Sequence, residues 1–212
     1  MNSVLLVYYS FTGEAETVAG LAEAELAKAG FEVHLARIDF TDPQLRLRRP
    51  LSPAAVGRWT KAAESGEIYE ISVEPAEALA RRYSLVCLIS NTWQHHPSVP
   101  VRSLLASGKL AAVLRDTPFA VYIVCRRSWQ KNLEIVRREA EQAGGVYLAS
   151  ERFEHGGSNL GSLLRTVSYL MSGGKRTARL LGLRLPLPSY GLSPQALARI
   201  PVFTRSLCRH FA

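Results

Sequence analysis

The chain has 212 residues, of which 47% are hydrophobic and 21% charged, a composition typical of a single water-soluble domain with a substantial core. No apolar run approaches the length of a membrane span, and the N-terminus enters a predicted strand at once, so we expect neither a transmembrane segment nor a signal peptide. The three cysteines are scattered without a C-x-x-C pair, which predicts reduced thiols, no metal site and a cytoplasmic protein.

The net charge of +8 is concentrated at the C-terminal end of the chain. From residue 155 onward there is no Asp or Glu, whereas this segment carries eight Lys and Arg residues, so residues 1–154 are formally neutral. We therefore do not expect a nucleic-acid-binding protein. We expect residues 155–212 to dock on an anionic partner, either an acidic carrier protein or an anionic membrane surface. The alternative is an ordinary basic helical cap over the sheet.

The first element is a strand followed by a short polar turn and a helix. Residues 4–9 form a continuous apolar run, as in a strand buried on both faces of a parallel sheet, and residues 15–29 have helical apolar spacing. This arrangement leaves backbone N–H groups free at the helix N-terminus, beside the hydroxyl groups of Ser10 and Thr12. The turn therefore predicts a site for one phosphate group. The alternative is a common turn in which Thr12 only caps the helix.

The remaining elements alternate between strands and helices. Strands are predicted at residues 31–38, 85–89, 119–124 and 146–150, and helices at 99–115, 131–143, 159–172 and 193–211, the last split by Pro201. This order predicts a doubly wound parallel sheet with helices on both faces. We expect one domain at 1–155, followed by a basic helical C-terminal extension at 156–212 that packs on the same domain.

An insertion at residues 41–82 is too long for a simple connection. It contains a basic loop at 45–50, a helix at 52–65, a short extended piece at 67–73 and a second helix at 74–83. The insertion is either a solvated excursion or a lid over a site.

Ligands of an open parallel sheet bind outside the carboxyl ends of its strands. Residues 10–15, 90–98 and 125–129 form the loops at these ends. Trp93 and Trp129 each follow an apolar strand, so they are candidates either to stack on a planar ring or to pack against a neighbouring helix.

The same loops carry the candidate catalytic residues. His95 and His96 could donate protons to a substrate near neutral pH, or be inert surface residues. Cys125 could be a thiolate favoured by Arg126 and Arg127, or a structural cysteine at a strand end.

The sequence YSFTGEAETVA at residues 9–19 resembles the T/S-x-T-G-x-T phosphate loop of the flavodoxin-like family. Ser10, Thr12 and Gly13 match the motif, whereas Glu14 and Ala15 stand where Asn or Gln and Thr are usual. The resemblance implies a five-stranded parallel sheet of order 2-1-3-4-5. It also implies that an FMN phosphate is held by the loop residues Ser10, Phe11, Thr12, Gly13, Glu14 and Ala15. A carboxylate beside a phosphate is repulsive unless it is turned away or paired, so we expect weaker FMN binding than the full motif gives.

The segment Asn91-Thr92-Trp93, with residues 97–100, resembles the third-strand loop of the quinone-reductase-like branch of this family. The resemblance implies that the flavin ring lies between the Trp93 and Trp129 loops. Arg126 and Arg127 could stabilise the anionic reduced flavin, bind a substrate phosphate, or be solvated charges without a role. Residues 93–100, 125–129 and 171–175 also resemble a small bacterial group labelled dialkylresorcinol condensing enzymes.

These resemblances imply an FMN-dependent oxidoreductase that uses NADH or NADPH to reduce a quinone, aromatic or polyketide-like small molecule. One alternative is a flavin-free protein that acts in, or scaffolds, a dialkylresorcinol-type biosynthetic pathway. A pure electron carrier is less favoured, because flavodoxin carriers are usually acidic and this chain is basic. The oligomeric state is left open, with a homodimer among the alternatives.

Overall fold

The computed structural model describes residues 2–172, 177–180, 183–186 and 190–211. The N-terminal half of the chain runs β1 (Ser3–Tyr8), α1 (Glu14–Lys28), β2 (Glu32–Phe40), α2 (Pro53–Ser65), β3 (Ile71–Glu74), the 3-10 helix η1 (Ala76–Ala80), β4 (Leu85–Trp93), β5 (His96–Pro97) and α3 (Val99–Ala106). The C-terminal half runs α4 (Ala111–Leu114), β6 (Pro118–Cys125), α5 (Gln130–Gln142), β7 (Val146–Glu154), α6 (Asn159–Ser172), β8 (Thr177–Leu180), β9 (Leu183–Pro186) and α7 (Pro194–Cys208).

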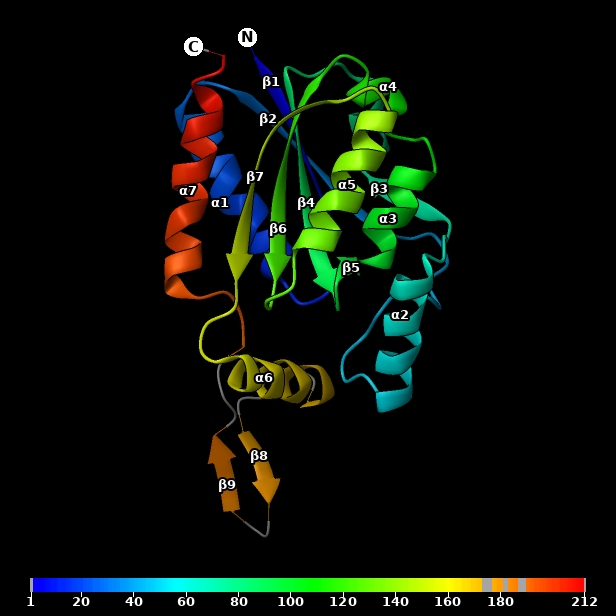
Figure 1. Ribbon diagram of the computed structural model, residues 1–212, viewed down its shortest axis with the longest axis vertical. Helices are drawn as coiled ribbons and strands as arrows, with labels where there is room; N and C mark the ends of the chain where they lie inside the picture. The colour runs from blue at the N-terminus through cyan, green and yellow to red at the C-terminus, as the bar shows by residue number, and fades with distance from the viewer. Residues whose placement is uncertain (1, 173–176, 181–182, 187–189, 212) are drawn as a thin grey trace.

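The predicted order of the five parallel strands is confirmed. In the labels of Figure 1 it is β2-β1-β4-β6-β7, and each neighbouring pair is parallel. The register aligns Leu6 with Leu35 on one side and with Cys87 on the other. The extended piece predicted in the insertion becomes β3, which adds an antiparallel strand at the β2 edge. Two short additions therefore extend a flavodoxin-like sheet: β3 at its edge and β5, which pairs with the end of β4.

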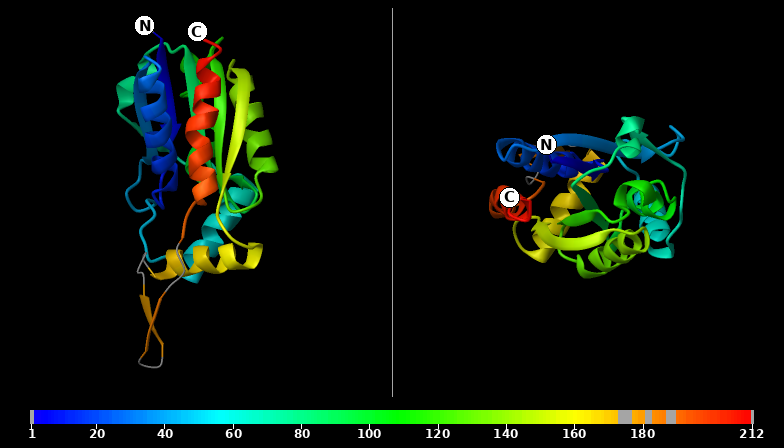
Figure 2. Two further views of the ribbon diagram at one scale, coloured as in Figure 1. Left: turned by 90° about the vertical axis from the view of Figure 1, so that its left-hand side faces the viewer. Right: turned by 90° about the horizontal axis from the view of Figure 1, so that it is seen from above.

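Helices cover both faces of the sheet, as predicted. Alternate residues of a strand point to opposite faces, so Val4 and Leu6 pack with α1 and α7, whereas Leu5 and Val7 pack with α3, α4 and α5. Helices α1 and α7 lie side by side (Figure 2). The salt bridge from Arg205 to Glu25, at 2.9 Å, ties these two helices together. Helix α7 thus belongs to the helical layer of the domain, although it follows the whole C-terminal insertion of α6, β8 and β9.

Three predicted elements differ from the structure, and one hairpin was not predicted. The helix predicted at 99–115 is two helices, because Gly108 adopts a φ of 71° in the turn between them. The helix predicted at 74–83 is replaced by the end of β3 and by η1, and its start carries Pro75. Helix α7 continues through Pro201, held by the buried Ile200 and Leu207. The Leu- and Pro-rich stretch near residue 180 contains the β8–β9 hairpin.

Helix α6 lies across the carboxyl ends of the strands, and the hairpin projects beyond it (Figure 1). Both termini lie at the opposite end of the molecule, where the Asn2 side chain donates to the Phe211 carbonyl oxygen at 3.4 Å. Within the described residues, none of the helices is both long and apolar enough to cross a membrane.

Candidate functional site

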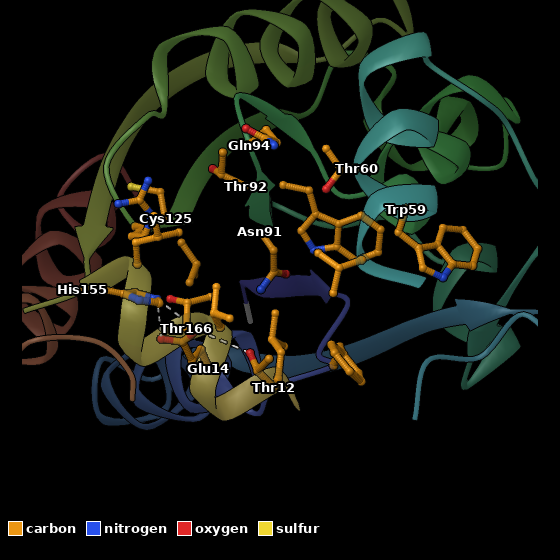
Figure 3. Close-up of a pocket in the computed structure, with 18 of the residues that line it drawn as sticks. Thr12, Glu14, Trp59, Thr60, Asn91, Thr92, Gln94, Cys125, His155 and Thr166 are labelled. Atoms are coloured by element: carbon orange, nitrogen blue, oxygen red, sulfur yellow. Dashed lines mark hydrogen bonds and ion pairs between the residues drawn. The ribbon is translucent and has the colours of Figure 1, made fainter. Parts of the chain in front are cut away.

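A cavity of about 320 Å³ lies at the carboxyl edge of the sheet, where the loops after β1, β4 and β6 meet (Figure 3). The insertion forms one wall through Leu47, Leu51 and Trp59, and α6 forms another through Leu163, Val167 and Leu170. The insertion also bonds to α6 directly, since the Leu51 N–H donates to the Leu170 carbonyl oxygen at 2.9 Å. The insertion therefore borders the site, as the lid alternative requires.

The loop after β1 carries the predicted anion site. Gly13 adopts a φ of 89°, in the left-handed region that favours glycine, and α1 begins at the next residue. Among the described residues, the backbone N–H groups of Thr12, Gly13, Glu14 and Ala15 donate to no protein acceptor. Four free donors at a helix N-terminus suit a phosphate or carboxylate.

The side chains of this loop do not all face the cavity. Phe11, Thr12 and Glu14 line it. Ser10 is buried, and its hydroxyl oxygen accepts from the Glu16 N–H at 3.3 Å, so this hydroxyl caps the first turn of α1. Ala15 is fully buried in the core. A threonine at position 15 would therefore bury its hydroxyl group instead of offering it to a ligand.

Glu14 is the centre of a buried polar cluster at the same end of the cavity. Its carboxylate lies against His155, whose Nε2 is 2.9 Å from Oε1 and 3.1 Å from Oε2. The Tyr190 hydroxyl donates to Oε2, and the Thr12 hydroxyl lies 3.4 Å from the same oxygen. Desolvation, and then the Glu14 carboxylate, raise the pKa of Tyr190 well above its usual value, so the phenol stays protonated and remains a donor. Glu14 is thus paired, which was one of the two conditions for a phosphate nearby.

Two tyrosines from the C-terminal part of the chain, Tyr169 and Tyr190, contact this loop. Tyr169 of α6 stacks on Tyr190 with ring centroids 4.1 Å apart, and Arg49 of the insertion lies over Tyr169 at 4.5 Å. The Tyr169 hydroxyl donates to the Thr12 carbonyl oxygen at 3.3 Å, and the Tyr190 hydroxyl lies 3.3 Å from Thr12 Oγ1. Two stacked tyrosine rings therefore contact the loop after β1.

The loop after β4 presents Asn91, Thr92 and Trp93 to the cavity. The Trp93 ring packs edge-on against Tyr9 at 6.2 Å and against Trp59 of the insertion at 6.1 Å. Asn132 of α5 fixes the loop, because its Nδ2 donates to the Thr92 hydroxyl oxygen at 2.8 Å. Trp93 is thus both a packing residue and part of the cavity wall.

The two candidate histidines have different environments. His95 is exposed and lines the cavity, as a proton donor would have to. His96 is buried in the β4–β5 hairpin, outside the residues that line the cavity, and burial lowers its pKa. The histidine pair is therefore divided, and His95 alone remains a candidate for proton transfer in this cavity.

The loop after β6 contributes Cys125 to the cavity wall. Burial raises the pKa of its thiol to about 12, which favours the structural cysteine over the thiolate. Arg126 and Arg127 also line the cavity, and both guanidinium groups bond to protein carbonyl groups: Arg126 to that of Asn159 at 2.9 Å and Arg127 to that of His155 at 2.8 Å. Both arginines thus hold the segment that leads from β7 into α6.

Trp129 is not among the residues that line the cavity, which favours packing over ring stacking for this tryptophan. Its ring packs beneath the Arg152 guanidinium, 4.9 Å away, in a smaller depression bordered by Leu133. Trp129 directly precedes α5, as its N-cap residue.

Three residues of the site were not predicted: Trp59, His155 and Tyr190. His155 and Tyr190 reach Glu14 from 141 and 176 residues away, so no local pattern connects them. The one available signal was Glu14 itself, because a carboxylate at the start of a buried helix requires a partner. Within the part of the chain that the structure describes, no group of His, Cys, Asp or Glu could hold a metal ion.

The sheet order, the two helical layers and a ligand-sized cavity at the carboxyl edge define a flavodoxin-like α/β protein. Two solved structures share this fold. A flavoprotein in complex with FMN from Lactobacillus acidophilus NCFM has a TM-score of 0.53 at 16% identity, over 72% of this chain and 93% of that one. Oxidised flavodoxin 1 from Bacillus cereus has a TM-score of 0.52 at 10% identity, over 100% of both chains. No protein-family model and no curated protein matches the sequence.

Proposed function

We propose that the cavity binds FMN and that the protein is an FMN-dependent oxidoreductase of the cytoplasm. The observation that carries this proposal is the loop after β1. Its backbone N–H groups at residues 12–15 have no acceptor among the described residues, and its Thr12 and Glu14 line the same cavity that Trp93 borders. A phosphate at one end and a planar ring at the other are the two features of FMN that such a site recognises. The similar flavoprotein of Lactobacillus acidophilus was solved in complex with FMN.

The residues present fit the phosphate of FMN, with a weakened affinity. Four N–H donors and the Thr12 hydroxyl supply hydrogen bonds, and the Glu14 carboxylate is paired with His155 and Tyr190. Ser10 adds no hydroxyl group because it caps α1, and Ala15 has none to offer. The loop would therefore hold a phosphate mainly through backbone donors, with a hydrogen-bonded carboxylate beside it.

The side chains at the other end of the cavity would hold the ring. Trp93 would lie against it, and Asn91 and Thr92 offer amide and hydroxyl groups to its polar edge. Bound FMN would supply electron and hydride transfer, which none of the protein's own side chains provides. His95 is exposed at the rim and can donate a proton to a substrate above the ring, whereas the neutral Cys125 thiol contributes only an apolar wall.

The finer assignment is reduction of a quinone, an aromatic or a polyketide-like molecule at the expense of NADH or NADPH. The apolar wall formed by Leu163, Val167 and Leu170 supports an apolar acceptor rather than a highly charged one. The test is a titration of the purified protein with FMN, followed by NADH or NADPH oxidation with a short-chain quinone. We expect quenching of tryptophan fluorescence at one FMN per chain, then quinone-dependent oxidation. Saturation without quenching would contradict the site, and binding without turnover would contradict the reaction.

A second function is favoured by the two stacked tyrosines that contact the loop after β1. Tyr169 and Tyr190 both bond to Thr12, and Glu14 already places an anionic group at this end of the cavity. These contacts would occupy the phosphate end of the cavity in a protein that has lost flavin binding and that acts in, or scaffolds, a dialkylresorcinol-type pathway. Absence of FMN and riboflavin binding in the same titration would support it over the first proposal.

A further inference from the structure

The end of the molecule opposite the termini is built from α6 and the β8–β9 hairpin, which we call the α6 end (Figures 1 and 2). Helix α6 crosses the carboxyl edge of the sheet, and the hairpin projects past it away from the domain. Ser162 is the one residue of α6 that is fully buried. A helix of 14 residues with so little burial has most of its surface accessible to solvent or to a binding partner.

The exposed surface of α6 is apolar. Leu160 and Leu164 are 67% and 59% exposed, and Val167 and Met171 are 42% and 45% exposed. These four residues follow a spacing of four, three and four, which places them on one stripe of the helix. Leu163, also on α6, is 42% exposed. Away from α6, three large apolar residues of the described chain are comparably exposed, and each stands alone on a different part of the chain: Ile68, Val146 and Val202. A contiguous exposed stripe marks an interaction surface, whereas isolated apolar residues do not.

The helix is held to the domain through polar contacts, so the stripe is not needed for its attachment. Arg126 bonds to the Asn159 carbonyl oxygen at 2.9 Å, the Leu170 carbonyl oxygen accepts from the Leu51 N–H at 2.9 Å, and Tyr169 bonds to Thr12 at 3.3 Å. These bonds fix both ends of α6. They orient its apolar stripe without burying it.

The hairpin repeats this division between apolar and basic residues. Its register pairs Ala178 with Leu185, Leu180 with Leu183, and Arg179 with Arg184. The register thus sets Arg179 and Arg184 opposite each other, between two pairs of apolar residues. Lys175 and Arg176 lie outside the described residues, but the sequence shows that no Asp or Glu occurs anywhere after Glu154.

We propose that the α6 end docks on an anionic lipid bilayer. An amphipathic helix with a basic surround lies in the plane of the membrane interface, its apolar stripe turned to the acyl chains and its cations among anionic headgroups. An acidic carrier protein would match the charge but offers no comparable apolar layer for the stripe. Since Leu163 and Val167 of α6 also line the cavity, docking would bring its mouth to the bilayer, where apolar substrates dissolve. The proposal does not depend on FMN binding.

The test is co-sedimentation of the full-length protein with two kinds of vesicle: phosphatidylcholine alone, and phosphatidylcholine with about 30 mol% phosphatidylglycerol. We expect binding to the anionic vesicles at low ionic strength, much weaker binding to the neutral ones, and release by added KCl. Equal binding to both vesicles would remove the electrostatic part of the proposal. Absence of binding to either vesicle would overturn it.

Two double variants separate the apolar and the basic contributions. Leu160→Ser with Leu164→Ser should lower the affinity for anionic vesicles at least tenfold, and Arg179→Gln with Arg184→Gln by about 25-fold, at about fivefold for each cation near an anionic surface. The matched controls are Val146→Ser with Val202→Ser, two exposed apolar residues on other elements, and Lys28→Gln with Arg209→Gln, two exposed cations near the termini. Neither control should change binding by more than twofold.

Because all the substituted residues of α6 are exposed, the variants should keep the thermal midpoint of the parent, which circular dichroism verifies. A loss of binding in the charge control as large as in the hairpin variant would show that net charge alone acts, and would overturn the assignment to the α6 end. If the parent protein does not bind vesicles but binds an acidic carrier protein through the same leucines, the surface is a protein-binding site and the lipid proposal is wrong.

Discussion

Exchanging Glu14 for glutamine should tighten FMN binding and at the same time destabilise the protein. The exchange keeps the shape of the side chain but removes a negative charge at the phosphate end of the cavity. Two unit charges about 6 Å apart repel by about 3 kcal/mol at an effective dielectric constant of about 20. His155, 2.9 Å from the carboxylate, offsets part of this repulsion. We therefore expect a gain of about 1–2 kcal/mol, which lowers the Kd for FMN by a factor of about 5 to 30.

The same exchange weakens the cluster that holds Glu14. Its carboxylate accepts from His155 and Tyr190 in a buried position, and hydrogen bonds to a charged group stabilise by about 1.5–3 kcal/mol. Urea unfolding of the FMN-free variant should show a lower free energy of unfolding by about 1–3 kcal/mol. Opposite signs for the two measurements distinguish this account from a general loss of structure, which would lower both.

The assay is a titration followed by flavin or tryptophan fluorescence, with riboflavin and FMN in parallel. Riboflavin lacks the phosphate, so its affinity should not respond to Glu14→Gln. The matched control is Glu16→Gln, because Glu16 is an exposed carboxylate in the same first turn of α1 and should change FMN binding much less. If FMN and riboflavin gain affinity equally, or if FMN binds more weakly to the variant, the phosphate does not lie at this loop.

Three further predictions concern the cavity. Trp93→Ala should weaken FMN binding by about 1 kcal/mol or more and remove most of the fluorescence quenching, whereas Trp129→Ala should change neither, because that ring lies outside the cavity; equal effects would contradict the placement. The pKa of Cys125 is raised to about 12, above that of an unfolded thiol. Alkylation of Cys125 by iodoacetamide should therefore stay slow in the folded protein up to about pH 10 and become fast on unfolding. Rapid alkylation of the folded protein at pH 8 would show that Cys125 is a thiolate after all. His155→Ala should lower the free energy of unfolding in urea by about 3–5 kcal/mol, because it leaves Glu14 buried without its partner. Adding Glu14→Gln should recover part of that loss. Purely additive losses would mean that the two side chains do not interact.

The architecture could be predicted from the sequence where local patterns decide it. The apolar run of β1, the polar turn and the helix that follows are set by neighbouring residues, and the order of the parallel strands follows from the alternation of elements. The position of the turn between β1 and α1 was predictable for the same reason. Pro75 and Gly108 each changed a predicted helix through its own backbone preference, which periodicity alone underestimates.

The parts that could not be predicted depend on contacts between distant segments. Glu14 looked unfavourable for a phosphate site because the sequence does not show that His155 and Tyr190 converge on it. Trp129 looked equivalent to Trp93 because both follow apolar strands, yet its ring packs with Arg152 and Leu133 and does not line the cavity. The β8–β9 hairpin was missed because its residues are short runs of Leu and Arg whose pairing, rather than composition, makes them strands.

The central claim, that the loop after β1 holds the phosphate of FMN, is tested most directly by the phosphorus NMR spectrum of FMN bound to the protein. Free FMN titrates with a phosphate pKa near 6, so its resonance moves as the pH crosses that value. A phosphate held by the four backbone N–H groups of residues 12–15 should give a shifted resonance that no longer moves between about pH 5.5 and 8, because the hydrogen bonds stabilise its dianion. A bound FMN whose phosphate titrates like the free molecule would contradict the claim.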